Sequence, residues 1–362
     1  RIRINLLTQR GRSDIAKRVK ELSLPIEINW NDLVELVCNE VIERARQGEP
    51  VQELWTPDDV KPPTYLLHPL IVQHYPNVIF GDPGSWKSSI AVVLSQILLL
   101  PWQDNPMGLK PLERSVKCLF LDWETDADTI RWQLKMLQKG IEPEIPLFLP
   151  YRRCDQPLAS DLEQIEQHVA DTKAEVIIID SLGLAAGGEL KETQSPLTFY
   201  AALRKLNTTA LILAHNPKDR ETKTRSIYGN QFFTAGARNV WELRKNQETG
   251  SDELDIALFH RKPPPFSKLH IPLGFKVKFD NENGKMNILH RDPKNVTEFL
   301  EQMGTRQRIR ELLKTGKLSP SEIAESLDIS KANARKTIFD LKNRGELIKD
   351  NEGKYGLLSK ET

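Results

Sequence analysis

The chain has 362 residues, a formal net charge of +1, 39% hydrophobic residues and 28% charged residues. This composition is ordinary for a soluble globular protein, and it argues against a chain coated in basic charge while leaving room for a local basic patch. The three cysteines, Cys38, Cys118 and Cys154, form no CxxC pair, which excludes a zinc ribbon or a CxxC redox motif and fits a reducing, cytoplasmic compartment.

The first 65 residues are predicted to form an N-terminal helical extension and a linker. Apolar residues at positions 33, 34, 37, 38, 41 and 42 fall on one face of a helix over residues 30–47. The simplest interpretation is an amphipathic helix that packs on the core. Pro50 and the run 61–63 indicate the linker. Because the first residue is Arg1 and not Met, we expect the chain to begin inside a longer polypeptide.

Residues 66–292 alternate short apolar runs with helical patterns. The apolar runs lie at 77–80, 116–123, 175–180, 210–215, 239–244 and 254–260, and the helical patterns at 88–100, 128–138, 158–171 and 196–206. This alternation predicts an α/β domain with a mostly parallel sheet flanked by helices. Further runs at 275–281 and 286–290 predict an antiparallel addition at one edge. The longest apolar run, near 90–100, is too short to span a bilayer, and no secretory signal is visible, so no membrane association is expected.

A glycine-containing loop stands between the first predicted strand of this domain and its first helix. Residues 81–88 read Gly-Asp-Pro-Gly-Ser-Trp-Lys-Ser, which is the context of a P-loop. Backbone N–H groups and the positive end of the helix would bind phosphates, Lys87 would neutralise the β- and γ-phosphates of ATP, and Ser88 would bind Mg²⁺. The residues predicted to bind the nucleotide are Gly81, Asp82, Pro83, Gly84, Ser85, Trp86, Lys87, Ser88 and Ser89.

One loop position departs from the P-loop pattern. A glycine is expected before the lysine, and Trp86 stands there. The indole is compatible with the loop if the backbone stays near helical angles. The alternative is that it covers or restricts the nucleotide and disables hydrolysis. A strand, turn and helix with chance glycines is the remaining interpretation.

Three predicted strands end in polar side chains. Asp180 is predicted to hold Mg²⁺ directly or through water, with a turn or helix-cap role as the alternative. Glu124 is the candidate base that activates the attacking water, and Asp122 is its rival. His215 would sense the γ-phosphate, with a merely local hydrogen bond as the alternative.

A cation from a neighbouring subunit often completes such a site as an arginine finger. The candidates are Arg238, Arg244, Arg261 and Lys262. Arg261 is the first choice because it ends a predicted strand, and Arg238 is the second. A plain surface charge is the alternative for each of them.

Together these segments resemble the RepA-like and KaiC-like P-loop ATPases, a RecA-type group that includes a plasmid-encoded hexameric replicative helicase. The resemblance covers roughly residues 66–290 and rests on residues 81–88, 121–124, 178–182, 214–215, 229–238, 240–243 and 259–262. It implies a RecA-like fold, a homo-oligomeric ring such as a hexamer with ATP at the subunit interfaces, and single-stranded DNA in the central channel. It also implies ATPase roles for Lys87, Ser88, Asp180 and Glu124, and a sensor role for His215.

The resemblance also implies that the loop at 217–232 faces the channel. Basic residues interleaved with aromatic residues suit a contact that follows the DNA backbone and stacks on bases. These residues are Lys218, Arg220, Lys223, Arg225, Tyr228 and Phe232. A solvated surface loop is the alternative.

Residues 304–362 are predicted to form a winged helix-turn-helix domain. Helices are expected at 305–314, 319–327 and 331–343, and short strands at 346–348 and 354–357. Ser319 with Glu322 forms a capping box, and Gly345 ends the last helix. From 305 to 362 there are 13 Lys or Arg and 9 Asp or Glu, a net charge of +4. The side chains expected to reach duplex DNA are Lys331, Asn333, Arg335 and Lys336.

The sequence as a whole favours a DNA-dependent ATPase, a ring-forming helicase or translocase in DNA replication or maintenance, with ATP and Mg²⁺ as cofactors. The main alternative is an ATP-controlled DNA-binding regulator or loader without strand separation. A recombinase-like filament former and a regulator that binds ATP without hydrolysing it are further hypotheses. For the C-terminal domain, a role in protein contacts is the alternative to DNA binding.

Overall fold

The computed structural model describes residues 6, 8–21, 28–47, 51, 53–56, 60–141, 144–217, 226–300 and 303–358. Residues 218–225 of the predicted DNA-binding loop lie outside the described residues, and they include its four basic residues, Lys218, Arg220, Lys223 and Arg225. The chain divides into two compact units, Arg1–Lys61 and Pro62–Thr362. Among the described residues, no helix is long and apolar enough to cross a membrane.

The first unit is a pair of helices, α1 (Gln9–Glu21) and α2 (Trp30–Gln47). Ala16 of α1 is buried against Val34 and Cys38 of α2. The helix predicted at 30–47 is therefore confirmed, and the partner that covers part of its apolar face is α1. Leu33, Val37 and Val41 on this face are exposed, and Ile42 is partly buried.

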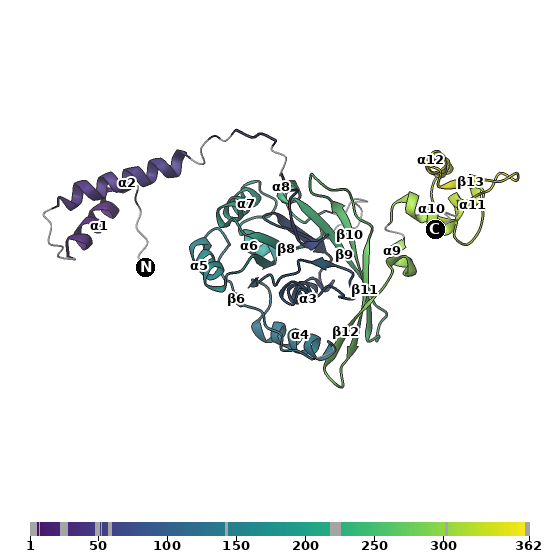
Figure 1. Ribbon diagram of the computed structural model, residues 1–362, viewed down its shortest axis with the longest axis horizontal. Coiled ribbons are helices and arrows are strands. Elements are labelled where there is room, and N and C mark those ends of the chain that lie inside the picture. Colours follow the sequence, from purple (N-terminus) through teal and green to yellow (C-terminus); the bar gives the residue numbers. More distant parts are fainter. Residues whose placement is uncertain are drawn as a thin grey trace. The chain divides into compact units, whose positions relative to one another are not determined.

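The second unit is built on a nine-stranded sheet in the order β12-β11-β10-β9-β3-β8-β7-β5-β6 (Figure 1). The six strands from β9 to β6 in this order are parallel, and β10, β11 and β12 each run antiparallel to their neighbours. The strands are β3 (Pro76–Gly81), β5 (Cys118–Asp122), β6 (Tyr151–Arg153), β7 (Val176–Asp180), β8 (Thr209–His215), β9 (Asn239–Asn246), β10 (Glu253–Lys262), β11 (Leu273–Asp280) and β12 (Lys285–His290). The predicted α/β fold with a mostly parallel sheet flanked by helices and an antiparallel edge is confirmed.

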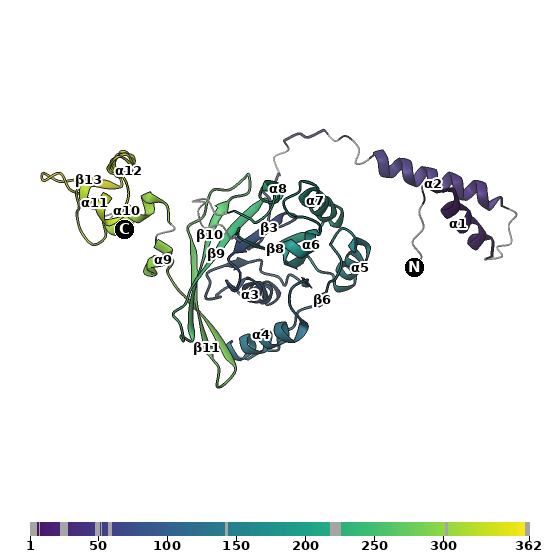
Figure 2. The ribbon, with the colours of Figure 1, turned by 180° about the vertical axis from the view of Figure 1, so that it is seen from behind.

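Helices cover both faces of the sheet (Figures 1 and 2). Because side chains alternate along a strand, Ile79 and Phe120 join the core under α3 and α4, whereas Phe80 and Leu121 join the core on the other face. The helices are α3 (Lys87–Leu99), α4 (Ala127–Gly140), α5 (Leu162–Thr172), α6 (Leu182–Ala186), α7 (Gln194–Leu206) and α8 (Gln231–Gly236).

A small second sheet packs beside β3. It has three strands in the order β2-β1-β4, and they are β1 (Tyr65–His68), β2 (Ile71–Val72) and β4 (Lys110–Pro111). The buried Asn77 side chain ties β2 to β3, since it accepts a hydrogen bond from the Val72 N–H at 2.9 Å and donates to the Val72 carbonyl at 3.0 Å. Strands this short carry no readable alternation, and the sequence did not predict them.

The antiparallel edge of the large sheet reaches α4, as Figure 1 shows for β12. Asn287 donates to the Gly140 carbonyl at 3.1 Å, and Lys139 donates to the Asn283 carbonyl at 2.7 Å. A Cβ at Gly140 would lie 1.8 Å from the Met286 carbonyl oxygen, so only glycine fits at this crossing. The helix and the strand are therefore in backbone contact.

The chain ends in a group of elements with a core of its own, which we call the C-terminal module. Its core includes Ile309, Ile323 and Leu341. The predicted capping box is present, because Ser319 accepts a hydrogen bond from the Glu322 N–H and donates its own N–H to the Glu322 carboxylate. The elements are α10 (Thr305–Leu312), α11 (Pro320–Ser326), α12 (Lys331–Asn343), β13 (Leu347–Lys349) and β14 (Tyr355–Leu357), preceded by η1 (Pro293–Asn295) and α9 (Thr297–Leu300).

Candidate active site

The carboxyl ends of four neighbouring parallel strands, β3, β8, β7 and β5, meet at one edge of the large sheet. Gly81 at the end of β3 is in register with His215 at the end of β8, and Asp180 at the end of β7 is in register with Asp122 at the end of β5. In open α/β sheets, ligands bind outside the carboxyl ends of the strands. The polar residues predicted from separate segments are thus brought together where a ligand is expected.

The loop from β3 to α3 has the backbone geometry of a phosphate cradle. The Ser85 N–H donates to the Asp82 carbonyl at 3.1 Å, and Gly84 has a φ of +67°. Ser88 and Ser89 lie in the first turn of α3, whose amino-terminal N–H groups favour an anion. A Cβ at Gly81 would lie 2.5 Å from a backbone carbonyl oxygen of β9, so glycine is required there.

The Lys87 ammonium is held inside this loop. It donates to the carbonyl oxygens of Gly81 at 3.2 Å and Asp82 at 2.9 Å, and to the Ser85 hydroxyl at 3.4 Å. The side chain is buried, and burial lowers the pKa of Lys87, while the carboxylates of Glu124, Asp180 and Asp82 act in the opposite direction. The loop therefore presents a positive charge that faces the neighbouring strand ends.

Trp86 has a left-handed backbone, with φ 78° and ψ 23°. The near-helical backbone angles that were the condition for an indole compatible with the loop are therefore not found at Trp86. A non-glycine residue in this region costs roughly 1–2 kcal/mol. The indole is partly buried against the core, with its ring centroid 6.4 Å from that of Phe275. Core packing of a large aromatic ring offsets the backbone strain at a position that glycine usually occupies.

The side chains of Asp180, at the end of β7, and Ser88, in the first turn of α3, provide a pair of candidate oxygen ligands for a metal ion. Asp180 is 1% exposed, and burial raises its pKa to about 6, while a hydrogen bond with the Ser88 side chain acts in the opposite direction. The Oδ2 atom of Asp180 is buried with no hydrogen-bond partner among the described residues. A hydroxyl and a carboxylate that has one oxygen without a hydrogen-bond partner suit Mg²⁺, because this ion prefers oxygen ligands and usually keeps several waters.

In the described part of the chain, no three His, Cys, Asp or Glu side chains form a cluster that could hold a metal ion. A cation at Ser88 and Asp180 would therefore need further oxygen ligands from phosphates or water. Mg²⁺ at nucleotide sites is commonly bound in this way.

Glu124 lies in the turn that follows β5, with its side chain 29% exposed. Its Oε1 accepts hydrogen bonds from the Ser181 hydroxyl at 2.5 Å and from His215 Nε2 at 3.0 Å. The hydrogen bond from His215 lowers the pKa of Glu124. The carboxylate is therefore ionised at neutral pH and reachable by water, as a general base must be.

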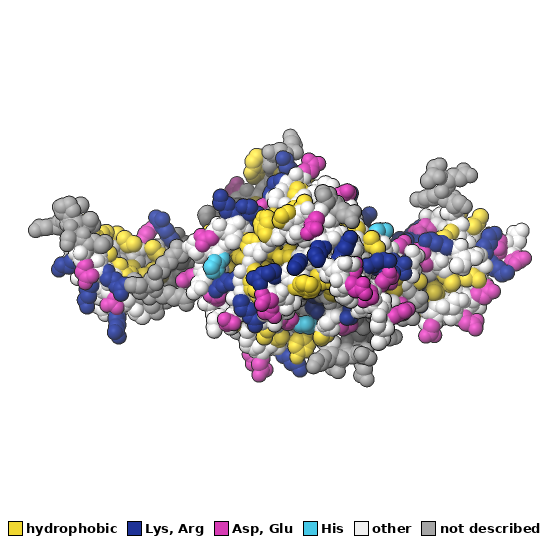
Figure 3. Space-filling model, turned by 90° about the horizontal axis from the view of Figure 1, so that it is seen from below, with side chains coloured by type: hydrophobic (Ala, Val, Ile, Leu, Met, Phe, Trp, Pro, Cys, Tyr) yellow, Lys and Arg dark blue, Asp and Glu magenta, His cyan; other side chains and the backbone are white. Residues whose placement is uncertain are grey.

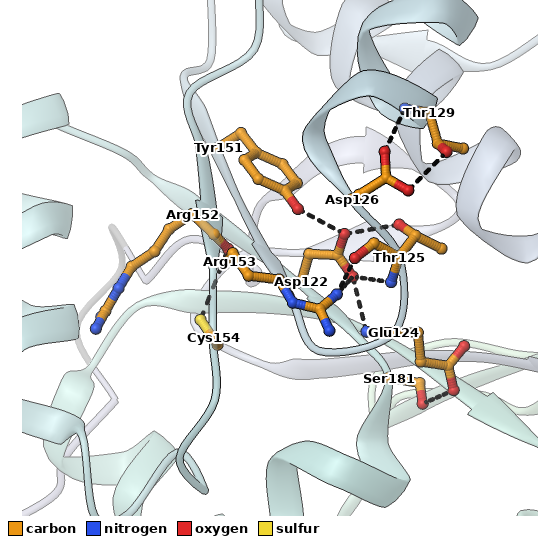
Figure 4. A network of polar contacts seen from close by, with 10 residues as sticks. All are labelled: Asp122, Glu124, Thr125, Asp126, Thr129, Tyr151, Arg152, Arg153, Cys154 and Ser181. Carbon is orange, nitrogen blue, oxygen red and sulfur yellow. Dashed lines mark hydrogen bonds and ion pairs between the residues drawn. The ribbon is translucent and has the colours of Figure 1, made fainter.

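Asp122, the rival candidate, is fully buried and organises the same turn (Figure 4). It accepts hydrogen bonds from the N–H groups of Glu124 and Thr125 at 2.8 Å, from the Thr125 hydroxyl at 2.6 Å and from the Tyr151 hydroxyl at 2.9 Å. Arg153 on the next strand lies 3.9 Å away and donates to the Thr125 carbonyl. These partners occupy both oxygens of Asp122, so Glu124 is the better candidate for the base.

Two site residues were missed from the sequence. Ser181 donates to Glu124, as described above, and Asn216 ties β8 to the phosphate loop. The Asn216 side chain donates to Asp82 Oδ1 at 2.9 Å, and its N–H donates to the Gly81 carbonyl at 3.2 Å. Both residues directly follow a strand-end residue that was predicted, and this adjacency was the available signal.

Arg261 and Arg244 both pair with the fully buried Glu242 of β9, at 2.6 Å and 2.7 Å. Lys262 donates to three carbonyl oxygens at the end of α8, those of Thr234, Ala235 and Ala237. Lys262 thus caps a helix within its own chain. Whether Arg261 serves a neighbouring subunit stays a prediction.

Arg238 directly precedes β9, at the edge of the sheet opposite the phosphate loop, where its N–H donates to the Pro76 carbonyl at 3.0 Å. It lines a cavity of about 410 Å³ together with Tyr200 of α7. A smaller cavity of about 280 Å³ lies beside the phosphate loop and includes Arg244. Within a single chain, Arg238 is therefore separated from the other site residues by the length of β3.

The residues predicted to bind duplex DNA are all exposed on the first turns of α12. The Ser330 hydroxyl caps this helix by accepting a hydrogen bond from the Asn333 N–H at 3.2 Å. The residues are Lys331, Asn333, Arg335 and Lys336. Of the other predicted DNA-contacting residues, Tyr228 is 39% exposed and Phe232 is 41% exposed.

Comparison with known families agrees with a P-loop ATPase-type domain in this chain. Residues 43–221 match the family described as AAA domain, which is just under half of the chain. No curated protein sequence matches significantly. Among solved structures, a KaiC-like protein from the hyperthermophilic archaeon Pyrococcus horikoshii OT3 is similar, with 15% identity, a TM-score of 0.40, and coverage of 62% of this chain and 93% of that chain.

Proposed function

We propose that this chain is a Mg²⁺-dependent ATPase that acts on DNA as a ring-forming helicase or translocase. The observation that carries the ATPase proposal is the meeting of Lys87, Asp180, Glu124 and His215 at the carboxyl ends of adjacent strands, beside a loop that fits phosphate. Each residue type matches one requirement of phosphoryl transfer to water.

In this proposal, Lys87 neutralises charge on the β- and γ-phosphates, and the N–H groups at the start of α3 bind phosphate oxygens. A water molecule attacks the γ-phosphorus, the bond to the bridging oxygen breaks, and Glu124 accepts the proton of the water. Both hydrogen bonds to Glu124 go to Oε1, so Oε2 is the oxygen that would take the proton. His215 would hold the carboxylate in position and respond to the loss of the γ-phosphate.

Ser88 and Asp180 would hold Mg²⁺, which supplies charge neutralisation on the phosphates when bound. Two observations support this assignment. Oδ2 of Asp180 has no hydrogen-bond partner among the described residues, and the Asp180 side chain forms a hydrogen bond with Ser88. Removal of Mg²⁺ with a chelator should abolish hydrolysis.

The test is steady-state ATP hydrolysis with and without single-stranded DNA, on the wild type and on Lys87→Ala. We expect DNA to stimulate hydrolysis and Lys87→Ala to abolish it, because the substitution removes the charge inside the loop. Lys110→Ala, at an exposed position of β4, is the matched control and should keep wild-type turnover. Near-normal turnover in Lys87→Ala would contradict the assignment of the phosphate loop.

The support for DNA as a partner comes from the surface. Figure 3 shows Lys and Arg side chains on one face, interspersed with apolar and acidic ones, and the net charge of the chain is +1. The C-terminal module exposes basic residues at the start of α12, which suits a winged helix that reads a major groove. Deleting residues 305–362 should weaken binding to duplex DNA and leave basal ATP hydrolysis unchanged. In the full chain, the affinity for duplex DNA should fall steeply as the salt concentration rises.

A second candidate is an ATP-controlled DNA-binding regulator or loader. The observation that favours it is the C-terminal module, because a separate basic helix is suited to fixed binding on duplex DNA. Strand separation on a forked DNA substrate distinguishes the two. Hydrolysis without strand separation would favour the regulator.

A further inference from the structure

The cavity of about 410 Å³ lies at the amino ends of β3 and β8, and we call it the amino-edge cavity. Its volume is within the range of roughly 300–1,000 Å³ that is typical of small-molecule sites. Residues of α7, of α8 and of the turn before β3 line it, and the two helices lie side by side (Figures 1 and 2). The phosphate loop lies at the other end of β3, so the ATPase site does not account for this cavity.

The charged groups that line the amino-edge cavity are basic. Arg204 and Arg238 line it with exposed side chains, and His74 lines it as well. Among the described residues, no Asp or Glu lines the cavity, and the three segments that contain its lining residues have none. These segments are residues 60–81, 194–217 and 226–241. No carboxylate in them neutralises the two guanidinium groups, so the cavity favours a ligand with a negative charge.

The helix ends at the cavity do not cancel this positive charge. Helices α7 and α8 both end there, and each carboxyl end carries about half a negative elementary charge, so together they contribute roughly −1. Lys262 donates to carbonyl oxygens at the end of α8, and Lys205 lies in the last turn of α7. Burial lowers the pKa of Lys262, and the charge of Arg238 lowers it further. With Arg204, four cations therefore outweigh the two helix ends.

Aromatic rings form part of the apolar lining. Phe232 is 41% exposed although its side chain is apolar, and Tyr75 lines the cavity as well. The Tyr200 ring is held in place, because its hydroxyl donates to the Phe233 carbonyl at 2.6 Å and a Cβ at Gly236 would lie 2.4 Å from the ring. Cations that contact a phosphate backbone, next to aromatic rings on which bases stack, are the features that bind single-stranded nucleic acid.

We propose that the amino-edge cavity binds one nucleotide of single-stranded DNA, with its phosphate on Arg204 and Arg238 and its base against Phe232. This inference rests on the proposed action on DNA, and it assigns a DNA contact to the edge of the sheet opposite the ATPase site. An acidic peptide would satisfy the arginines but lacks the planar bases that suit the aromatic lining. A free mononucleotide offers the same phosphate and base, so the experiment separates it from a DNA strand.

The test measures binding of a fluorescent oligo(dT) strand to the full chain by anisotropy, over a series of salt concentrations. ADP and Mg²⁺ are present throughout, so that the phosphate loop is filled. Arg204→Ala should lower the affinity about tenfold, because a contact between a guanidinium and a phosphate is lost. The slope of log affinity against log salt concentration should become shallower by roughly 0.7, which corresponds to one phosphate contact of a single strand.

Lys110→Ala is the matched control, since Lys110 is an exposed cation outside the cavity, and it should keep the affinity and the salt slope of the wild type. Equal affinity and slope in Arg204→Ala and the wild type would overturn this inference alone. A wild type that binds no oligo(dT) would overturn the proposed action on DNA as well. ATP hydrolysis is measured separately, so neither result decides the ATPase proposal.

Variants of Phe232 test the contact with the base. Phe232→Ala should lower the affinity about fivefold or more and leave the salt slope unchanged, because it removes a ring and no charge. Phe232→Tyr keeps the ring and should keep the affinity. Equal losses of affinity in Phe232→Ala and Phe232→Tyr, with wild-type helix content by circular dichroism, would overturn the contact with the base.

Competition with free dTMP separates a DNA strand from a mononucleotide. Because a strand makes further contacts with the protein, dTMP should displace the labelled oligo(dT) only at concentrations far above those needed with unlabelled oligo(dT). Displacement by dTMP at a concentration similar to that of unlabelled oligo(dT) would identify a site for a free nucleotide and overturn the assignment to DNA.

Discussion

Strands β5 and β7 lie side by side and end in buried aspartates that are paired in register, Asp122 and Asp180. Asp122 accepts hydrogen bonds on both oxygens, from the turn that follows it and from Tyr151. Asp180 keeps one oxygen without a hydrogen-bond partner among the described residues, and burial raises its pKa to about 6. The two aspartates at equivalent positions therefore differ in their hydrogen bonding. Asp122 stabilises the turn after β5, whereas Asp180 keeps one oxygen available for a ligand.

The largest expected effect is on the rate of ATP hydrolysis, and it comes from Glu124, which lies in the turn that Asp122 stabilises. Glu124→Gln should lower kcat for ATP hydrolysis by about 10³-fold, because an amide cannot accept the proton of the attacking water. ATP binding should persist, since the phosphate loop is unchanged. Hydrolysis and nucleotide-binding assays measure the two effects, and Glu113→Gln at an exposed position is the control. If Asp122→Asn alone gave this pattern, the choice of base would be wrong.

The next effect tests the structural role of Asp122. Asp122→Ala leaves the N–H groups of Glu124 and Thr125 and the Tyr151 hydroxyl without their acceptor. We expect the free energy of unfolding to fall by about 3–5 kcal/mol, since each unsatisfied buried donor costs about 1–3 kcal/mol and the losses do not add fully. Urea unfolding measures this. A loss below about 1 kcal/mol would show that the turn holds without Asp122.

Asp180→Asn should have the opposite effect on stability. The ordinary pKa of an aspartate is 3.8 and that of Asp180 in the folded chain is about 6, so the contribution of this carboxyl to stability is full below pH 3.8 and is lost as pH rises through 6. An uncharged amide avoids the cost of the buried charge. In the absence of Mg²⁺ and ATP, the variant should therefore be more stable than the wild type at pH 7.5, by at most about 3 kcal/mol. This difference should close toward pH 4, whereas a pH-independent difference in urea unfolding would contradict this account.

The smallest expected effect comes from the edge strand. Tyr151→Phe removes one of the hydrogen bonds to Asp122 and should cost about 1 kcal/mol of stability. It should also lower kcat several-fold without changing KM, because the Glu124 turn loosens while the phosphate loop stays intact. Tyr65→Phe is the control, since the buried Tyr65 hydroxyl has no hydrogen-bond partner among the described residues. An equal loss of kcat in Tyr151→Phe and Tyr65→Phe would contradict an effect of Tyr151 that acts through Asp122.

Much of the sheet was predictable from the sequence, because its strands are apolar runs that end in polar residues. The rule that parallel strands expose their carboxyl ends at one edge then placed Asp180, Glu124 and His215 together. The capping box at Ser319 and Glu322 was equally accessible, since it depends only on residues three apart. Patterns of this kind are local or follow from the fold class.

Contacts between distant segments were not predictable. Nothing in the sequence indicates that Tyr151 reaches Asp122, or that Arg261 pairs with Glu242. Strands β1, β2 and β4 are too short to show alternation. The left-handed backbone of Trp86 was missed as well, because it is stabilised by a tertiary contact with Phe275, 189 positions away in the numbering of the chain.

The crossing of α4 and β12 at Gly140 fixes the length of α4. The helix begins at the Asp126 cap, directly after the Glu124 turn, and its last residue is the one position where the backbone of β12 leaves no room for a Cβ. Removing or adding one residue would turn the helix by about 100° and bring a residue with a side chain to the crossing. An insertion or deletion within α4 would therefore put a side chain against the backbone of β12, so the length of α4 sets the distance between the Glu124 turn and the far edge of the sheet.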